Sequence, residues 1–323
     1  INAQVGSNGQ IRKDVKFTKP DLRKVKGNIR RSTLVKAPTE VVDAQKSYTA
    51  MTWKIKGLDG HKAMKEVLAL GQAALMRAQG WLTADELSNI SAERRDAVAS
   101  KNEAIKRSVN ALYRAAKKVS SGEEINEMWF DWFIAQNGRL MIDSAGLNPQ
   151  GDKLHRHAMG IKGTESLVTK ENEHVFKLGV AQAFGFDTDK KSTAASMKFA
   201  EQLLTKDGLE AIEKEWAKYL QELKTGGSTR KLKVQIGDTA IELKTEIISH
   251  TADGVEAVRQ YVQADGKEFT TTLTLEMDGI TNGFALKVLQ FATSLDKAFG
   301  KDGKTAAEEW MNKVGLEINN DGT

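Results

Sequence analysis

The residues best suited to chemistry lie near the carboxyl end of the chain, in the segment Asp278-Gly279-Ile280-Thr281-Asn282-Gly283. They directly follow an alternating, β-branched run at 270–277, which predicts a strand. Apolar residues then recur at helical spacing from Phe284 to Leu295. A carboxylate at the mouth of a strand-turn-helix can present a rigid ligand to a divalent metal ion. The simpler interpretation is an Asp-Gly turn that binds nothing.

A second group of candidate residues surrounds a predicted β-hairpin. An apolar run at 129–134 is followed by Asn137-Gly138 and then by a second apolar run at 140–142, and Asn-Gly between such runs favours a tight hairpin turn. The hairpin places Arg139 directly after the turn, where nothing bulky shields it. Lys153 and Arg156 follow the segment Leu147-Asn148-Pro149-Gln150-Gly151.

Together, these segments resemble conserved motifs of the single-subunit phage RNA polymerases. Asn137-Gly138-Arg139 with Asn148-Pro149-Gln150 resembles their "GR…NPQ" segment, and Asp278-Gly279-x-x-Asn282-Gly283 resembles palm motif A. The residues of both motifs are most similar to those of the virion-packaged RNA polymerases of the N-four-like podophages. The resemblance covers most of the chain. One position departs from the pattern, because Ala135 stands where the family usually has Asp or Thr.

The resemblance implies nucleotidyl transfer from ribonucleoside triphosphates by a two-metal mechanism with Mg²⁺. Asp278 would be the catalytic carboxylate and a metal ligand, and the carbonyl of Gly279 would be a second oxygen ligand. The template would be DNA and the product RNA.

The resemblance also assigns nucleic-acid contacts. Arg139 would hold the nucleic-acid backbone, since a guanidinium fits phosphate bidentately, and Lys153 and Arg156 would add phosphate contacts. Asn282 would be a further nucleic-acid contact. In related DNA polymerases a glutamate at the position of Gly283 blocks the ribose 2′ hydroxyl, so a glycine there leaves the steric gate open and favours RNA synthesis.

Two further family motifs do not occur in this chain. No tyrosine precedes a glycine, as the triphosphate-gripping motif B requires, and no histidine precedes an aspartate, as motif C requires. The chain starts at Ile1 rather than Met. We therefore expect a piece of a long virion polymerase or one subunit of a split polymerase. Either would be inactive without the remaining region or second subunit that carries motifs B and C.

The predicted fold class is α+β, mostly helical, with the thumb and palm of a right-hand polymerase of the DNA polymerase I type and with the fingers largely absent. The expected divisions are a basic N-terminal arm at 1–58, a helical thumb-like region at 59–125, an N-terminal palm at 126–300 and the start of the fingers at 301–323.

Hydrophobic periodicity predicts the individual helices. The pattern is helical from 59 to 118, where Thr83-Ala84-Asp85-Glu86 is a capping box. An antiparallel pair of long helices there, with a basic side, could clamp a duplex, although such faces are often only solvated. Further helices are expected at 171–185, 192–206, 207–224 and 252–264, whereas 226–250 fits either a hairpin or a helix.

Composition limits the class of protein. The 323 residues carry a net charge of +5, and residues 1–36 hold ten Lys or Arg against two acidic residues. This excess favours nucleic acid as a polyanionic partner, although solubility alone could explain such a tail. The lack of cysteine excludes disulfides and thiolate zinc sites. His155 and His157 are only two positions apart, which suits a shared metal poorly. No membrane span or signal peptide is visible. The resemblance implies the phage virion or the host cytoplasm as the location.

Two other functions remain open at this level. The chain could be a virion structural or ejection protein that keeps a polymerase-like fold without chemistry, as the departure at Ala135 suggests. It could also be a non-catalytic nucleic-acid-binding protein, as its basic N-terminal segment suggests.

Overall fold

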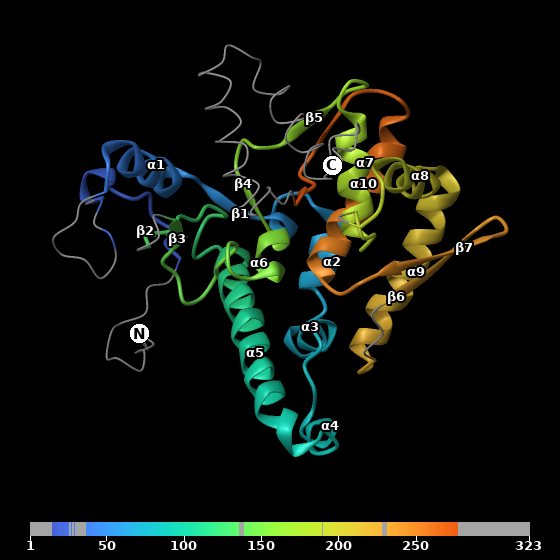
Figure 1. The fold of residues 1–323 in the computed structure, drawn as a ribbon, viewed down its shortest axis with the longest axis horizontal. Helices are drawn as coiled ribbons and strands as arrows, with labels where there is room; N and C mark the ends of the chain where they lie inside the picture. Colours follow the sequence, from blue (N-terminus) through green and yellow to red (C-terminus); the bar gives the residue numbers. More distant parts are fainter. Residues whose placement is uncertain are drawn as a thin grey trace, which may run out of the picture. The chain divides into compact units, whose positions relative to one another are not determined.

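A computed structural model describes residues 15–25, 27, 29, 37–135, 139–188, 190–227 and 231–276 (Figure 1). The chain divides into two compact units, Ile1–Thr274 and Leu275–Thr323, and nearly all described residues belong to the first. Among the described residues helices predominate and the strands form four two-stranded antiparallel sheets, so the predicted mostly helical α+β class is confirmed. No helix among the described residues is long and apolar enough to cross a membrane.

The N-terminal segment joins the body of the protein earlier than expected. Helix α1 (Thr39–Ala50), strand β1 (Trp53–Ile55) and the 3₁₀ turn η2 (Lys56–Leu58) lie within the predicted arm, after the 3₁₀ turn η1 (Leu22–Lys24). Strand β1 pairs with β4 (Met159–Ile161). An arm that extends to residue 58 is therefore wrong, since residues 39–58 form regular elements and the strand among them pairs with the body.

The helical region at 59–118 contains four helices instead of one antiparallel pair. They are α2 (Lys62–Leu68), α3 (Gln72–Ala78), α4 (Ala84–Ser88) and α5 (Ala92–Ser120). Only α5 is long, which corrects the predicted pair of long helices. Gly71 and Gly80 explain the breaks: both have φ above +80°, a conformation that glycine adopts without strain. The predicted capping box is confirmed, because Thr83 and Glu86 each accept the other's backbone N–H.

Helix α10 (Ile248–Ala264) packs against α2, α7, α9 (Lys206–Lys224) and α6 (Lys153–Ala158). Of its first twelve residues all except Glu256 are buried. Close packing requires Gly254, since a Cβ there would lie 2.9 Å from the Cβ of Ala183 on α7 (Glu173–Ala183). The predicted helix starts at 252, whereas the observed helix begins at Ile248. Its first turn includes the polar residues Ser249, His250 and Thr251, and all three are buried.

The remaining helices and strands confirm three predicted helices and show which alternative holds for the ambiguous region 226–250. The predicted helices at 171–185, 192–206 and 207–224 are α7, α8 (Thr193–Leu203) and α9. The ambiguous region contains a hairpin of β6 (Lys231–Ile236) and β7 (Thr239–Lys244). Side chains of β6 alternate between exposed and buried, as a strand with one face on the core requires.

The predicted strand at 270–277 is much shorter than expected. Strand β8 (Phe269–Thr271) pairs with β5 (Ser166–Val168), and residues 272–276 have no regular structure. The prediction is therefore wrong for residues 272–276, and Met277 lies outside the described residues. Strand β5 offers only three residues to pair with, and the polar groups that follow bind a side chain instead, as described below.

Candidate functional site

The predicted hairpin is present and carries Arg139 on its surface. Strand β2 (Trp132–Ile134) pairs with β3 (Leu140–Ile142), and the backbone N–H of Ala135 donates to the carbonyl of Arg139 over 2.8 Å. Asn137 and Gly138, the expected turn residues, lie outside the described residues. Arg139 is exposed, which agrees with the expectation that nothing shields it.

Gln150 joins the two motif segments. Its side-chain Oε1 accepts from the backbone N–H of Ile142 over 2.9 Å, and its Nε2 donates to the carbonyl of Leu140 over 3.0 Å. The amide side chain therefore continues the ladder along β3 as a neighbouring strand would. The resemblance treats Gln150 only as part of a motif, whereas in the structure it fixes the loop beside the strand that follows Arg139.

Asn148 shapes the loop that leads to α6. Its Oδ1 accepts from the backbone N–H groups of Gln150 (3.1 Å) and Gly151 (2.9 Å), which closes an Asx turn around Pro149. Asp152 then caps α6 by accepting from the N–H of His155. Lys153 is consequently the first residue of this helix, and its side chain is exposed.

Arg156 braces the same loop from the next turn of the helix. Its Nε donates to the carbonyl of Pro149 over 3.2 Å and its Nη2 donates to the carbonyl of Gln150 over 2.9 Å. The sequence predicts a phosphate contact for this half-buried side chain, and that role remains a prediction. The sequence does not predict that Arg156 supports the loop, because nothing in the motif indicates that the carbonyls of Pro149 and Gln150 need a hydrogen-bond donor.

His155 also supports the NPQ loop, through hydrogen bonds at both of its ring nitrogens. The ring is fully buried, and its Nδ1 accepts from the backbone N–H of Asn148 over 3.1 Å. Nε2 must then carry the hydrogen, and it donates to the carbonyl of Ser108 on α5 over 2.9 Å. This histidine therefore anchors the NPQ loop to the long helix α5.

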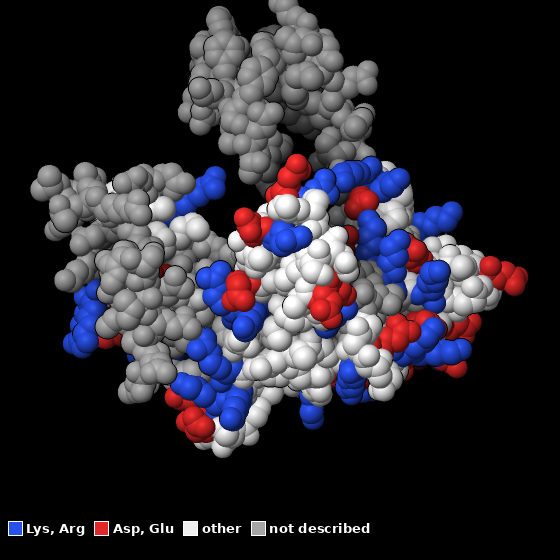
Figure 2. Space-filling model, turned by 90° about the horizontal axis from the view of Figure 1, so that it is seen from below, with Lys and Arg blue, Asp and Glu red and all other residues white. Residues whose placement is uncertain are grey.

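The basic side of α5 is exposed as predicted, through Lys101, Lys106, Arg107, Arg114, Lys117 and Lys118. Figure 2 shows one face of the molecule, on which Lys and Arg are interleaved with Asp and Glu around an uncharged centre. A face of mixed sign gives a weaker phosphate-binding field than a continuous basic stripe. The predicted duplex clamp therefore gains no support from this view.

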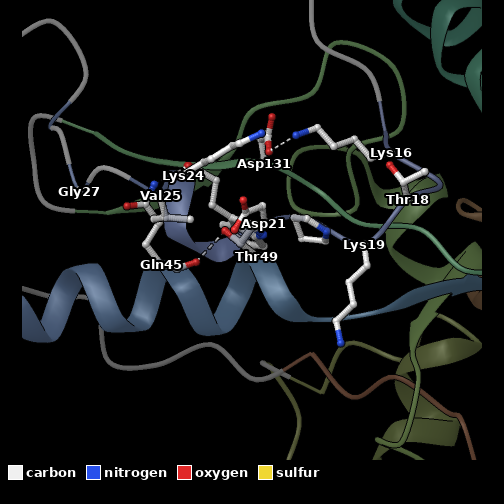
Figure 3. Close-up of a pocket in the computed structure, with 12 residues that line it drawn as sticks. Lys16, Thr18, Lys19, Asp21, Lys24, Val25, Gly27, Gln45, Thr49 and Asp131 are labelled. Atoms are coloured by element: carbon white, nitrogen blue, oxygen red, sulfur yellow. Dashed lines mark hydrogen bonds and ion pairs between the residues drawn. The ribbon is translucent and has the colours of Figure 1, made fainter.

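A cavity of about 630 Å³ lies between the N-terminal segment, α1 and the start of β2 (Figure 3). Its lining combines the lysines Lys16, Lys19 and Lys24 with the carboxylates of Asp21 and Asp131. Lys16 and Asp131 are paired at 2.7 Å. Because both signs are present and partly neutralise each other, the cavity does not select a ligand by charge.

A buried charge cluster contacts the segment just after β8. The Nζ of Lys56 donates to both carboxylate oxygens of Asp253, at 2.8 and 2.7 Å, and the Nε2 of His61 lies 3.0 Å from the same carboxylate. The Lys56 and Asp253 side chains are 4% and 0% exposed. Such a pair is stable only if each charge keeps its partners.

The cluster extends to two further elements. The same Lys56 Nζ donates to the carbonyl of Thr272 (2.9 Å) and to the hydroxyl of Thr274 (3.2 Å), just beyond β8. His157 stacks on His250 with 3.8 Å between the ring centroids, and its Nδ1 lies 3.8 Å from the Asp253 carboxylate. No local sequence pattern indicates this cluster, since its members are up to 218 positions apart.

The predicted metal-site residues cannot be placed in the same way. Asp278, Gly279, Asn282 and Gly283 all lie outside the described residues. Within the ranges that the structure describes, no group of three or more His, Cys, Asp or Glu residues could hold a metal ion.

Comparison with known proteins shows which proteins this chain is similar to. Residues 59–159 match the family described as a virion DNA-directed RNA polymerase domain. The chain is also 30% identical over 189 residues to the virion DNA-directed RNA polymerase of Enterobacteria phage N4, across 57% of this chain. The chain is related to virion RNA polymerases. The predicted resemblance is thereby confirmed.

The relationship has clear bounds. The chain matches 5% of the length of the phage N4 polymerase, so it corresponds to a small part of that protein. The family match at 59–159 includes Arg139, Gln150, Lys153 and Arg156 but ends before Asp278. Homology to virion RNA polymerases therefore covers the GR and NPQ segments that Gln150 joins.

Proposed function

We propose that this chain forms the thumb and the N-terminal palm of a phage virion DNA-directed RNA polymerase. The observation that carries the proposal is the Gln150 clamp, which holds the GR and NPQ segments together inside the region that matches the virion polymerase family. In this assignment residues 59–125 are the thumb, 126–300 the palm and 301–323 the start of the fingers. The template is DNA, and the protein is carried in the virion and acts in the host cytoplasm.

The exposed cations of the clamp contact nucleic acid. Arg139 and Lys153 are both exposed, one directly before β3 and the other at the first turn of α6, and Gln150 ties those two elements together. Their charges bind phosphate without reading sequence. Arg156 adds to this contact while it braces the loop.

Asp278 and Gly279 supply oxygen ligands for Mg²⁺, and a carboxylate and a carbonyl are the hard donors that this ion prefers. When bound, the metal stabilises the charge that develops during phosphoryl transfer. The second carboxylate and the triphosphate-gripping helix come from the remaining polymerase region or from a second subunit that carries motifs B and C. Gly283 leaves room for the 2′ hydroxyl of a ribonucleotide, and Asn282 contacts nucleic acid.

The test is template-dependent RNA synthesis by the complete polymerase. Asp278→Asn should abolish synthesis and leave binding to DNA unchanged. Arg139→Gln and Lys153→Gln should each weaken binding to DNA. Each should also reduce the slope of log affinity against log salt concentration by about 1, because one phosphate contact is lost. Lys218→Gln on α9, at a side chain that is 65% exposed, is the matched control and should change neither. RNA synthesis by Asp278→Asn at the normal rate would refute the proposal.

The alternatives predict different outcomes. A virion structural or ejection protein, which the departure at Ala135 favours, would make no RNA in any combination with motifs B and C. A non-catalytic nucleic-acid-binding protein would show the salt dependence of Arg139 and Lys153 but no response to Mg²⁺ or to Asp278→Asn.

A further inference from the structure

The cavity between the N-terminal segment, α1 and β2 has unpaired ammonium groups in its lining, although the lining as a whole is of mixed sign. Figure 3 shows Lys16 and Lys24 extending toward Asp131, and of these two lysines only Lys16 is paired with that carboxylate, at 2.7 Å. The other carboxylate, that of Asp21, is paired with a guanidinium outside the lining. Lys19 and Lys24 form no ion pair with a described residue. Two ammonium groups therefore remain for the phosphates of a ligand.

An aromatic side chain is also part of the lining. Trp132, the first residue of β2, is half-buried there. Tyr48 on α1 packs against it with 4.8 Å between the ring centroids, and Gln45 on the same helix donates from Nε2 to the carbonyl of Trp132 over 2.6 Å. Helix α1 thus holds Trp132 in place without a ligand. A fixed aromatic ring beside cations is the arrangement on which proteins stack the bases of single strands.

Two polar atoms of the lining residues lack a hydrogen-bond partner among the described residues. They are the Oε1 of Gln45, whose side chain belongs to a residue that is 7% exposed, and the Nε1 of Trp132. Buried polar atoms of native proteins are nearly always paired, so both call for a partner. Gln45 requires a donor and Trp132 requires an acceptor. A nucleotide offers donors on its base and acceptors on its base, sugar and phosphate, whereas a fully ionised inorganic anion offers acceptors alone.

The cavity is large enough for such a group, since its volume of about 630 Å³ lies within the roughly 300–1,000 Å³ of small-ligand sites. We propose that it binds one unstacked nucleotide of a single-stranded nucleic acid. The base stacks on Trp132 and donates to Gln45, and the flanking phosphates contact Lys19 and Lys24. Binding here requires neither Asp278 nor a metal ion, so the inference goes beyond the proposed function. Its failure would leave the test of RNA synthesis untouched.

The first experiment measures binding of a short, labelled, mixed-sequence DNA strand to the 323-residue chain without metal, by fluorescence anisotropy. Lys24→Gln should weaken binding and should lower the slope of log affinity against log salt concentration by about 0.7, the value for one phosphate contact of a single strand. Lys218→Gln, at the 65% exposed side chain on α9, is the matched control and should change neither. Equal affinities and slopes of these two variants would overturn the proposal.

The second experiment tests the stacked base. Trp132→Leu should weaken binding of the single strand at least about fivefold, the lower limit for one lost base-stacking contact. Trp132→Phe retains a ring and should weaken it less. Neither variant should alter binding of the duplex of the same sequence, because its bases are already paired and stacked. Equal losses for single strand and duplex would show general damage to the chain and would overturn the proposal.

The third experiment needs no variant. A single strand that carries 5-bromouracil, irradiated in complex with the unmodified chain, should cross-link to Trp132 or to another residue of the cavity lining. Cross-links found only elsewhere would overturn the proposal. An RNA strand of the same sequence distinguishes the two sources of this chemistry, and tighter binding of DNA or of RNA identifies the strand that the cavity takes.

Discussion

Asp253 should be among the most sensitive positions in the described part of the chain, and Asp253→Asn is the perturbation that tests this. The substitution preserves the shape of the side chain but removes its charge. Lys56 would then remain buried with a neutral amide where its counter-ion had been. His61 would also lose the carboxylate that lies 3.0 Å from its Nε2.

The expected cost follows from the burial of both partners. Removal of one member of a buried ion pair typically destabilises a protein by about 3–5 kcal/mol, because the other charge is left without compensation. A domain of this kind is stable by only about 5–15 kcal/mol in total. The variant should therefore unfold at a markedly lower urea concentration, by roughly 1 M or more for a slope of about 3 kcal/mol per M.

The loss should also depend on pH in a defined direction. Burial by itself raises the pKa of Asp253, but the charge of Lys56 and the neighbouring His157 and His61 side chains outweigh it and hold the pKa well below the ordinary 3.8. A depressed pKa in the folded state contributes stability that is fully present above pH 3.8, and this contribution declines progressively as the pH falls from 3.8 through the lower pKa of the folded state. The asparagine variant lacks this contribution, so the two proteins should become more alike below about pH 4.

The assay is urea unfolding of the 323-residue chain at pH 7 and at pH 3.5, followed by the fluorescence of its six tryptophans. Asp238→Asn, at an exposed turn position between β6 and β7, is the matched control and should change stability by less than about 0.5 kcal/mol. The reasoning is refuted if Asp253→Asn costs no more than Asp238→Asn at pH 7. It is also refuted if the difference between the unmodified chain and Asp253→Asn is the same at both pH values.

Three further predictions concern single contacts. Gln150→Ala removes two hydrogen bonds to β3 and should destabilise the chain by about 1–2 kcal/mol in urea unfolding, with faster amide exchange at Ile142; unchanged exchange there would contradict the clamp. Gly254→Ala should destabilise it by about 1–3 kcal/mol despite the better helix propensity of alanine, because the new Cβ would lie 2.9 Å from Ala183; a gain in thermal stability would contradict this packing. The hydrogen bond from Arg77 lowers the pKa of Glu86 to about 2, so Arg77→Gln should return its NMR titration midpoint towards 4.5; a midpoint that stays near 2 would contradict the pairing.

The sequence predicts well those elements whose signals are local. The apolar stripes of α7, α8 and α9 and the capping box of α4 depend on residues within one or two turns, so a single sequence contains all the information needed. The hairpin of β2 and β3 was equally clear, because two apolar runs flank an Asn-Gly pair. The motif resemblance then extended these local signals to a family relationship that the comparisons confirm.

The errors occur where distant contacts override local preference. Helix α10 begins at Ile248 because α2, α6 and α7 bury its polar first turn, and no periodicity could reveal those neighbours. Strand β8 stops early because β5 pairs with only three residues. The Nζ of Lys56 then donates to the carbonyl of Thr272 and to the hydroxyl of Thr274. In both places the deciding partner lies far away in the sequence.

The NPQ loop shows why a motif does not by itself identify chemistry. Asn148 and Gln150 use their side-chain amides on backbone groups, and His155 and the Arg156 guanidinium support the same loop. These residues act by holding a shape, which any protein with this loop would need whether or not it synthesises RNA. Arg139 and Lys153 differ because their side chains are exposed on the two elements that the shape brings together. A chain that kept the loop but lost both cations would retain the fold, and under the proposed function it would lose the phosphate contacts. The separate responses of Gln150→Ala in stability and of Arg139→Gln in salt-dependent binding would therefore distinguish the framework from the site it presents.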